Sequence, residues 1–165
     1  MRPAVEGDAG LYCDLYCDPD TMRFVGPPLT QERARRSFQK VLVSLGRRPL
    51  ERVLLVIVEK TTQQSIGIGA FQDFDSRLRR VEAGMMLRSG ARGRGFGTEG
   101  LRALVRFAFD TFEVDEVWIQ HAAHNRDAHR VPITLGLSHN ESGRSGKFIW
   151  SARRHSWPPD HPVSG

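Results

Sequence analysis

Apolar residues recur at helical spacing in two segments near the N-terminus. The first segment runs from about Asp8 to Cys17, and Asp8 is a residue type that commonly precedes a helix. The triplet Asp18-Pro19-Asp20 should end this helix. The second helix is predicted to begin at Thr30 and to end at Gly46. Its apolar residues, three and four positions apart, are Ala34, Phe38, Val41, Leu42 and Leu45.

The pattern then changes to that of strands. Val53 to Glu59 is an almost uninterrupted aliphatic run, which is typical of a strand covered on both faces. Ser65 to Phe74 and Val81 to Leu87 follow after short turns, so the three strands should form an antiparallel meander. Met1 to Ala4 is a candidate for a short first strand.

Helical periodicity returns in the second half of the chain. The clearest helix should start at or near Thr98 and continue to Phe112, and the strand Val114 to His121 comes after it. A helical crossover requires this strand to run parallel to the strand Val81 to Leu87. The remaining predicted elements are a helix over Arg126 to Leu135, stopped by Gly136, and a closing strand over Phe148 to Ala152.

This order predicts a single α/β (α+β) domain. Its sheet should be mixed and mostly antiparallel, with one parallel βαβ crossover and helices on both faces. We place the domain at residues 1–157 and treat 158–165 as a C-terminal tail. A chain of 165 residues is long enough to bury a substantial core without disulfides or metal.

Charge and cysteine content narrow the class of protein. The net charge of +5 favours acidic ligands, which include nucleic acid, a polyphosphate cofactor or an acidic protein. Cys13 and Cys17 have no partners at zinc spacing, so we interpret them as reduced intracellular thiols. No leader-like segment or membrane span is evident, and we therefore expect a cytoplasmic protein.

The stretch Leu87 to Leu104, LRSGARGRGFGTEGLRAL, leads from a predicted strand through clustered glycines into a helix. Unpaired N–H groups at a helix N-terminus bind anions, although a basic surface loop has the same composition. A Walker P-loop is excluded because no Lys-Ser/Thr pair follows the glycines. A Rossmann fingerprint fits the glycines at 95, 97 and 100, but the next strand ends Ile119-Gln120-His121 instead of with an acidic residue.

The segment from Arg92 to Gly97, R-G-R-G-F-G, reads R-x-x-G-x-G. Here the chain resembles the GNAT acyl-CoA N-acyltransferase superfamily, and more specifically it looks like the branch that contains the ribosomal-protein N-terminal acetyltransferases. The resemblance extends over nearly the whole chain. Its other matching residues are 18–24, Ile66-Gly67, Glu82-Ala83-Gly84, Gly97-Thr98-Glu99-Gly100, Asn125, Leu135-Gly136-Leu137 and Trp157.

The resemblance implies that acetyl-CoA binds at the glycine turn. The turn would hold the pyrophosphate, with at least one of Arg92 and Arg94 facing a phosphate. Pantetheine would lie between the strand Val81 to Leu87 and the crossover strand Val114 to His121, which would splay apart. The two methionines of the first strand could also pack in the core in that arrangement. The cofactor-binding residues implied in this way are Met86, Leu87, Arg92, Gly93, Arg94, Gly95, Phe96, Gly97, Thr98 and Asn125.

The implied reaction is direct attack of a primary amine on the thioester. Glu82 matches the position at which many family members carry a base, although it also has Arg79, Arg80 and Arg88 nearby in the sequence as ion-pair partners. Backbone N–H groups near Met86 would polarise the thioester carbonyl.

The chain also departs from the family pattern. Its only tyrosines are Tyr12 and Tyr16, so the C-terminal tyrosine acid of the family is absent. Ala128 replaces a serine, and Pro132 falls within a predicted helix. His121, His124 and His129 lie in this region, and we assign His124 as the candidate acid.

The sequence thus predicts an acetyl-CoA-dependent N-acetyltransferase without a metal. Its acceptor is a primary amine of a protein N-terminus, a lysine or a small molecule, and the residues do not distinguish among these. Two alternatives stay open: a catalytically weak CoA-binding or regulatory module, and a nucleic-acid-binding protein, which rests on charge alone. Membrane association is not expected, and a homodimer is left open.

Overall fold

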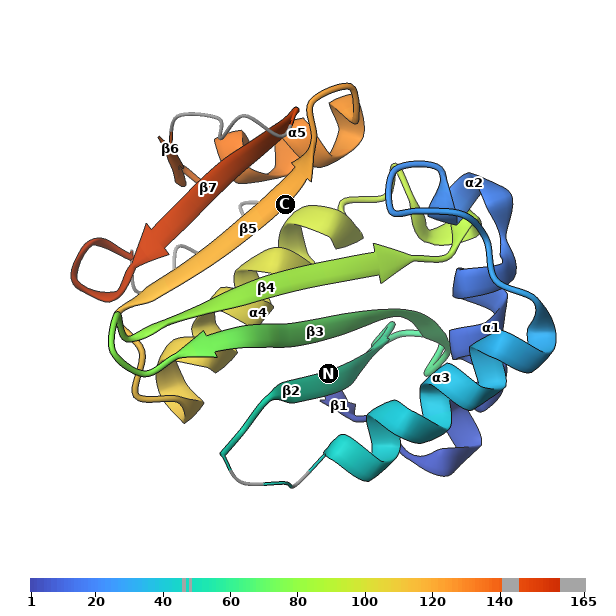
Figure 1. Cartoon of the computed structure of the whole chain (residues 1–165). Coiled ribbons are helices and arrows are strands. Elements are labelled where there is room, and N and C mark those ends of the chain that lie inside the picture. Colours follow the sequence, from blue (N-terminus) through green and yellow to red (C-terminus); the bar gives the residue numbers. More distant parts are fainter. Residues whose placement is uncertain (46, 48, 141–145, 158–165) are drawn as a thin grey trace.

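The computed structural model describes residues 1–45, 47, 49–140 and 146–157 (Figure 1). Within these residues, seven strands form one sheet in the order β1-β2-β3-β4-β5-β7-β6. The strands are β1 (Arg2–Pro3), β2 (Arg52–Val58), β3 (Ser65–Asp75), β4 (Arg80–Leu87), β5 (Glu116–Ala122), β6 (Ser138–Asn140) and β7 (Lys147–Arg153). The α-helices are α1 (Ala9–Cys17), α2 (Pro19–Met22), α3 (Gln31–Ser44), α4 (Phe96–Thr111) and α5 (Arg126–Thr134). Short 3-10 helices cover Glu6–Asp8, Ser89–Ala91 and Arg154–Ser156.

The meander and the crossover of the sheet have the predicted topology. Strands β2, β3 and β4 form an antiparallel meander, and β1 pairs antiparallel with β2. Helix α4 connects β4 to β5. These two strands form the parallel pair that the crossover requires. The mixed α/β fold expected from the order of elements is therefore confirmed.

Helices cover both faces of the sheet. Helix α4 passes behind the sheet in Figure 1, and its residues Leu104 and Val105 pack with Leu55 in the main core cluster. Leu54 and Val56 belong to a second cluster with residues of α1 and α3. Strand β2 is thus apolar on both sides, as its uninterrupted aliphatic run predicts.

Helix ends follow local chemistry. The Thr30 side chain accepts a hydrogen bond from the Arg33 N–H, as expected for the N-cap residue of α3. The Asp8 carboxylate does not cap α1; it accepts hydrogen bonds from the Val5 N–H and the Arg2 guanidinium. Helix α4 begins two residues before Thr98, because the residue before Phe96 is a left-handed glycine.

Two regions differ from expectation in other ways. Strand β6 was not predicted, because Ser138-His139-Asn140 is polar and exposed and shows no apolar alternation. Pro132 does lie inside α5, where it is buried, and the helix continues to Thr134. The predicted helix stop at Gly46 and the proposed tail at 158–165 lie outside the described residues.

Strands β4 and β5 pair over a short distance and then separate. Their partners are Arg80 with Glu116, Val81 with Val117, and Glu82 with Trp118. Beyond Glu82 no further pairs are formed, whereas β5 continues to pair with β7 along its length. Figure 1 shows the resulting wedge-shaped separation between the two strands, which we call the β4–β5 gap.

Candidate functional site

One side of the β4–β5 gap is an unpaired strand edge. The Arg88 N–H donates to the Ile66 carbonyl at 2.9 Å, which places that pair in the hydrogen-bonded register of β3 and β4. Antiparallel strands alternate this register, so Met86 is bonded to β3 while Met85 and Leu87 turn their backbone groups toward the gap. The N–H groups available there come from Met85 and Leu87 instead of from Met86, whose side chain packs against the α1–α3 cluster.

The glycine turn leads from this edge to the N-terminus of α4. Gly93 and Gly95 have φ angles of 71° and 85°, a region that side-chain-bearing residues rarely adopt. No described residue accepts a hydrogen bond from the N–H groups of residues 93–97. A Cβ added at Gly93 or Gly95 would meet no atom within 4 Å, so the turn leaves open space beside these donors. Donors, helix dipole and space together fit an anionic group such as a pyrophosphate.

Arg94 secures the turn to the end of β2. One of its guanidinium nitrogens lies 2.7 Å from a Glu59 carboxylate oxygen, and its guanidinium carbon is 4.9 Å from the centre of the Phe96 ring. The Thr62 hydroxyl donates to the same carboxylate at 2.7 Å. These contacts with Thr62 and Arg94 lower the pKa of Glu59 below its ordinary value.

Arg92 secures the other side of the turn. Its guanidinium donates to the Leu87 carbonyl at 3.1 and 3.2 Å and to the Thr21 hydroxyl at 2.6 Å. Thr21 in turn donates its N–H and hydroxyl to Asp18, and these bonds, more than the charge of Arg92, lower the pKa of Asp18. Both predicted phosphate-facing arginines thus have partners within the chain, and a phosphate contact from either remains a prediction.

Glu82 lies where the β4–β5 gap begins, and its side chain is buried. Its two carboxylate oxygens accept hydrogen bonds from Gln72 Nε2 at 3.2 Å and from Gln120 Nε2 at 3.0 Å. The alternative of an ion pair with a neighbouring arginine is wrong. The three arginines considered for it contact other acids: Arg79 with Asp115 at 2.6 Å, Arg80 with Asp75 at 3.8 Å and Arg88 with Asp14 at 2.7 Å.

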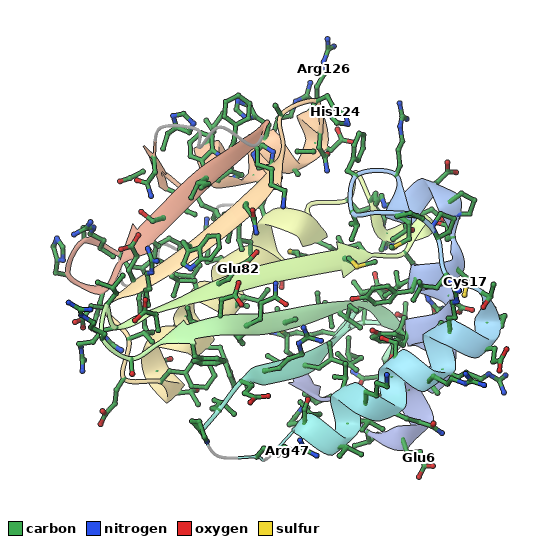
Figure 2. The ribbon with its side chains drawn as sticks, in the orientation of Figure 1. Glu6, Cys17, Arg47, Glu82, His124 and Arg126 are labelled. Carbon is green, nitrogen blue, oxygen red and sulfur yellow. The ribbon has the colours of Figure 1, made fainter. Side chains whose placement is uncertain are left out.

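His124 lies apart from Glu82. It is exposed after β5, and its ring centre is 5.1 Å from that of Phe24. Figure 2 shows Glu82 on β4 and His124 beyond the end of β5. No contact between the two is found among the described residues, and the role of His124 as an acid stays a prediction.

The other two histidines form a separate cluster. The rings of His121 and His129 are 5.4 Å apart at their centres, and Trp150 Nε1 donates to His121 Nε2 at 3.1 Å. Burial, together with the nearby His129 and His139, lowers the pKa of His121. This cluster packs with Phe148 on the side of β5 that bears Ile119, away from Glu82. The three histidines therefore do not act as one group.

Asn125 is the residue before α5. Its side-chain oxygen accepts a hydrogen bond from the Ala128 N–H at 3.1 Å. Helix α5 lies against the start of α4, since a Cβ at Gly97 would be 3.5 Å from Val131 Cγ2. The structure thus gives Asn125 a structural role as the residue that caps α5, and its contact with a cofactor stays a prediction.

Gln72 and Gln120 were not identified from the sequence as site residues. The available signal was a glutamine directly after the apolar run Val117-Trp118-Ile119, but its contact with Glu82 depends on the pairing register. Trp118 lies opposite Glu82 in the pairing of β4 and β5. Its indole N–H is buried without a hydrogen-bond partner among the described residues.

Within the described residues, no group of three or more His, Cys, Asp or Glu side chains is arranged to hold a metal ion. Among the helices of the described ranges, none has both the length and the apolar character needed to cross a membrane.

A family model described as "Acetyltransferase (GNAT) domain" matches residues 1–138. The chain therefore belongs to the GNAT acetyltransferase family, and the resemblance seen in the sequence is confirmed at that level. Among curated proteins it is 24% identical over 111 residues to "Uncharacterized N-acetyltransferase p20" of Bacillus licheniformis. That match covers 67% of this chain and 62% of the relative.

Solved structures share the fold at low sequence identity. The spermidine N-acetyltransferase of Vibrio cholerae, solved with CoA and spermine, has a TM-score of 0.80 at 13% identity, with 94% of this chain and 95% of that chain covered. The aminoglycoside acetyltransferase AAC(6')-Ib, solved with coenzyme A, has a TM-score of 0.77 at 15% identity, with 93% and 94% covered.

Proposed function

We propose that this protein transfers an acetyl group from acetyl-CoA directly to a primary amine. The observation that carries the proposal is the position of Glu82: a buried carboxylate at the start of the β4–β5 gap, on the strand whose free edge leads to a glycine turn with open N–H groups. Family membership and CoA-bound structural neighbours support the same assignment.

The residues at the turn and the gap fit acetyl-CoA. The open N–H groups of residues 93–97 would hold its pyrophosphate, and the free edge at Met85 and Leu87 would take an extended polar chain. When bound, acetyl-CoA supplies a thioester whose carbonyl carbon is attacked by the amine, with CoA leaving as the thiolate. The N–H groups of Met85 and Leu87 are the donors placed to polarise a carbonyl in the gap.

The role we give Glu82 is to take a proton from the amine. An α-amino group with a pKa near 7.7–8.0 is ~10–20% neutral at pH 7, whereas a lysine with a pKa near 10.4 is neutral about once in 2,500. A base therefore contributes more for a lysine or an alkyl amine than for a protein N-terminus. The departing thiolate, whose thiol form has an ordinary pKa of about 8.5, would take a proton from solvent or from His124.

The acceptor we propose is an amine on a small molecule, a lysine or a protein N-terminus. The relatives of known substrate act on spermidine and aminoglycosides, which supports a small-molecule amine. The ribosomal-protein branch and a cytoplasmic location stay predictions from the sequence.

An amine panel with acetyl-CoA tests the proposal. We expect CoA release with at least one amine, and Glu82→Gln should lower kcat by about 100-fold or more while acetyl-CoA binding is retained. Glu6→Gln is the matched control, because Glu6 is exposed and lies at the far side of the N-terminal helices in Figure 2. Wild-type kcat in Glu82→Gln would remove Glu82 from the reaction.

A second function is a module that binds CoA without efficient turnover. The observation that favours it is the position of the two tyrosines. Both lie on α1, where Tyr12 is bonded to Ser37 at 3.0 Å and burial raises the pKa of Tyr16, so neither serves as an acid at the gap. CoA binding with no turnover on any amine of the panel would support this function over the first.

A further inference from the structure

A line of polar side chains crosses four neighbouring strands through Glu82. The Arg52 guanidinium on β2 donates to Gln72 Oε1 on β3 at 3.3 Å, and Gln72 Nε2 donates to Glu82 on β4. Gln120 on β5 donates to the second oxygen of Glu82. A carboxylate only accepts hydrogen bonds, so the amide nitrogens must be the atoms that face it.

We propose that Gln72 and Gln120 are positioning residues that fix the orientation of the Glu82 carboxylate. This inference rests on the proposed function, in which Glu82 receives the proton of the amine. A carboxylate rotates about its terminal bond, and that torsion has broad, weak preferences. Two donors on different oxygens, one from each neighbouring strand, restrict this rotation.

Gln120 has a second effect on the gap itself. Backbone pairing between β4 and β5 ends at Glu82 and Trp118, and Gln120 is two residues further along β5. Its bond to Glu82 is therefore a side-chain link across the two strands just where their backbones part. It holds the base at a fixed place relative to both strands.

The donors are neutral, and this suits a proton acceptor. The arginines near Glu82 in the sequence contact Asp75, Asp115 and Asp14, so among the described residues no cation is bonded to the Glu82 carboxylate. A guanidinium in direct contact would compete with the incoming proton. Amide donors orient the carboxylate without neutralising its charge.

Substitutions that remove one donor test the proposal. Gln120→Leu and Gln72→Leu should each lower kcat by about 10-fold or more through misplacement of the base, with KM for acetyl-CoA changed less than twofold. Gln120→Asn, which keeps an amide but shortens it by one carbon, should have an intermediate kcat. Gln39→Leu on the exposed side of α3 is the control for the change in polarity.

The pH profile tests the contact between Gln120 and Glu82, and kcat separates positioning from a purely structural role. Gln120→Glu places a second carboxylate beside Glu82, so the acid limb of the kcat/KM profile should move to higher pH. A merely structural role predicts a lower melting temperature in Gln120→Leu with a wild-type kcat. Wild-type kcat and an unmoved profile in folded Gln120→Leu and Gln120→Glu would overturn the proposal.

A measurement without turnover distinguishes this failure from failure of the proposed function. The ¹³C resonance of the Glu82 carboxyl is followed against pH by NMR in the wild type and in Gln120→Glu. If the wild type acetylates no amine, the proposed function fails, and the positioning contact is still decided by this titration. A shifted midpoint in Gln120→Glu supports the contact, and an unchanged midpoint overturns it.

Discussion

Arg94 and Glu59 join the glycine turn to the end of β2 through an ion pair of 2.7 Å. The Glu59 side chain is 8% exposed while that of Arg94 is 53% exposed, so the carboxylate is the inner member of the pair. The guanidinium also covers the Phe96 ring. The pair therefore fixes the first residue of α4 relative to the sheet, and with it the direction of the turn's open N–H groups.

We expect Glu59→Gln to destabilise the protein at neutral pH and much less in acid. Glu59 has a lowered pKa in the folded state, so its stabilising effect is complete above the ordinary value of about 4.5 and is lost as pH falls through the lowered pKa. Urea unfolding at pH 7 and at pH 3 measures the difference. Glu51→Gln, at an exposed position, is the control, and an equal loss of stability at both pH values would contradict the ion pair's role.

Gly97→Glu separates cofactor binding from folding. A carboxylate in the first turn of α4 interacts favourably with the helix dipole by about 0.3–1 kcal/mol, and a Cβ there makes an ordinary 3.5 Å contact. The variant should thus remain folded while it repels the pyrophosphate. We expect its CoA-induced thermal shift to vanish, whereas Gly10→Glu on α1, where a Cβ meets nothing within 4 Å, should keep it. A retained shift in Gly97→Glu would place the cofactor elsewhere.

Thr21→Val tests the link between α2 and the turn. The substitution keeps the shape of the side chain but removes the hydroxyl that accepts from Arg92 and donates to Asp18. Each lost hydrogen bond costs about 0.5–1.5 kcal/mol, and Arg92 becomes free to leave the Leu87 carbonyl. CoA affinity measured by calorimetry should fall severalfold. Thr61→Val, in an exposed turn, should bind CoA as the wild type does.

His121 should make the fold less stable in mild acid. Its pKa is lowered in the folded state, so the unfolded chain binds the proton more strongly, and stability decreases as pH falls from about 6.5 toward the lowered value. Protonation also ends the bond that Nε2 accepts from Trp150. His121→Gln should flatten the melting temperature between pH 7.5 and 5.5, while His155→Gln at an exposed position should leave the slope unchanged. An unaltered slope in His121→Gln would assign the effect to other groups.

The elements predicted correctly are those whose sequence pattern carries their structure. The apolar spacing along α4 predicts an amphipathic helix, and the aliphatic run of β2 predicts a strand that is covered on both faces. The short turns predict the antiparallel meander. Strand β6 was missed because its three polar residues are ordered by pairing with β7. The early start of α4 was missed because it depends on the φ angle of Gly95.

The environment of Glu82 required three-dimensional information. The sequence drew attention to Arg79, Arg80 and Arg88 because they are close in number, but each contacts another acid. The actual partners are 10 and 38 residues away along the chain. They meet Glu82 because of the register of β3, β4 and β5, and register is set by the packing of the whole sheet.

The short outer strands have a consequence for association. Strand β1 has two residues and β6 has three, so within the described part of the chain neither end of the sheet offers a long row of unpaired backbone groups to a neighbouring molecule. The free edge of β4 beyond Glu82 instead faces inward, toward β5. The protein can therefore keep a strand open for an extended ligand with little risk of edge-to-edge aggregation.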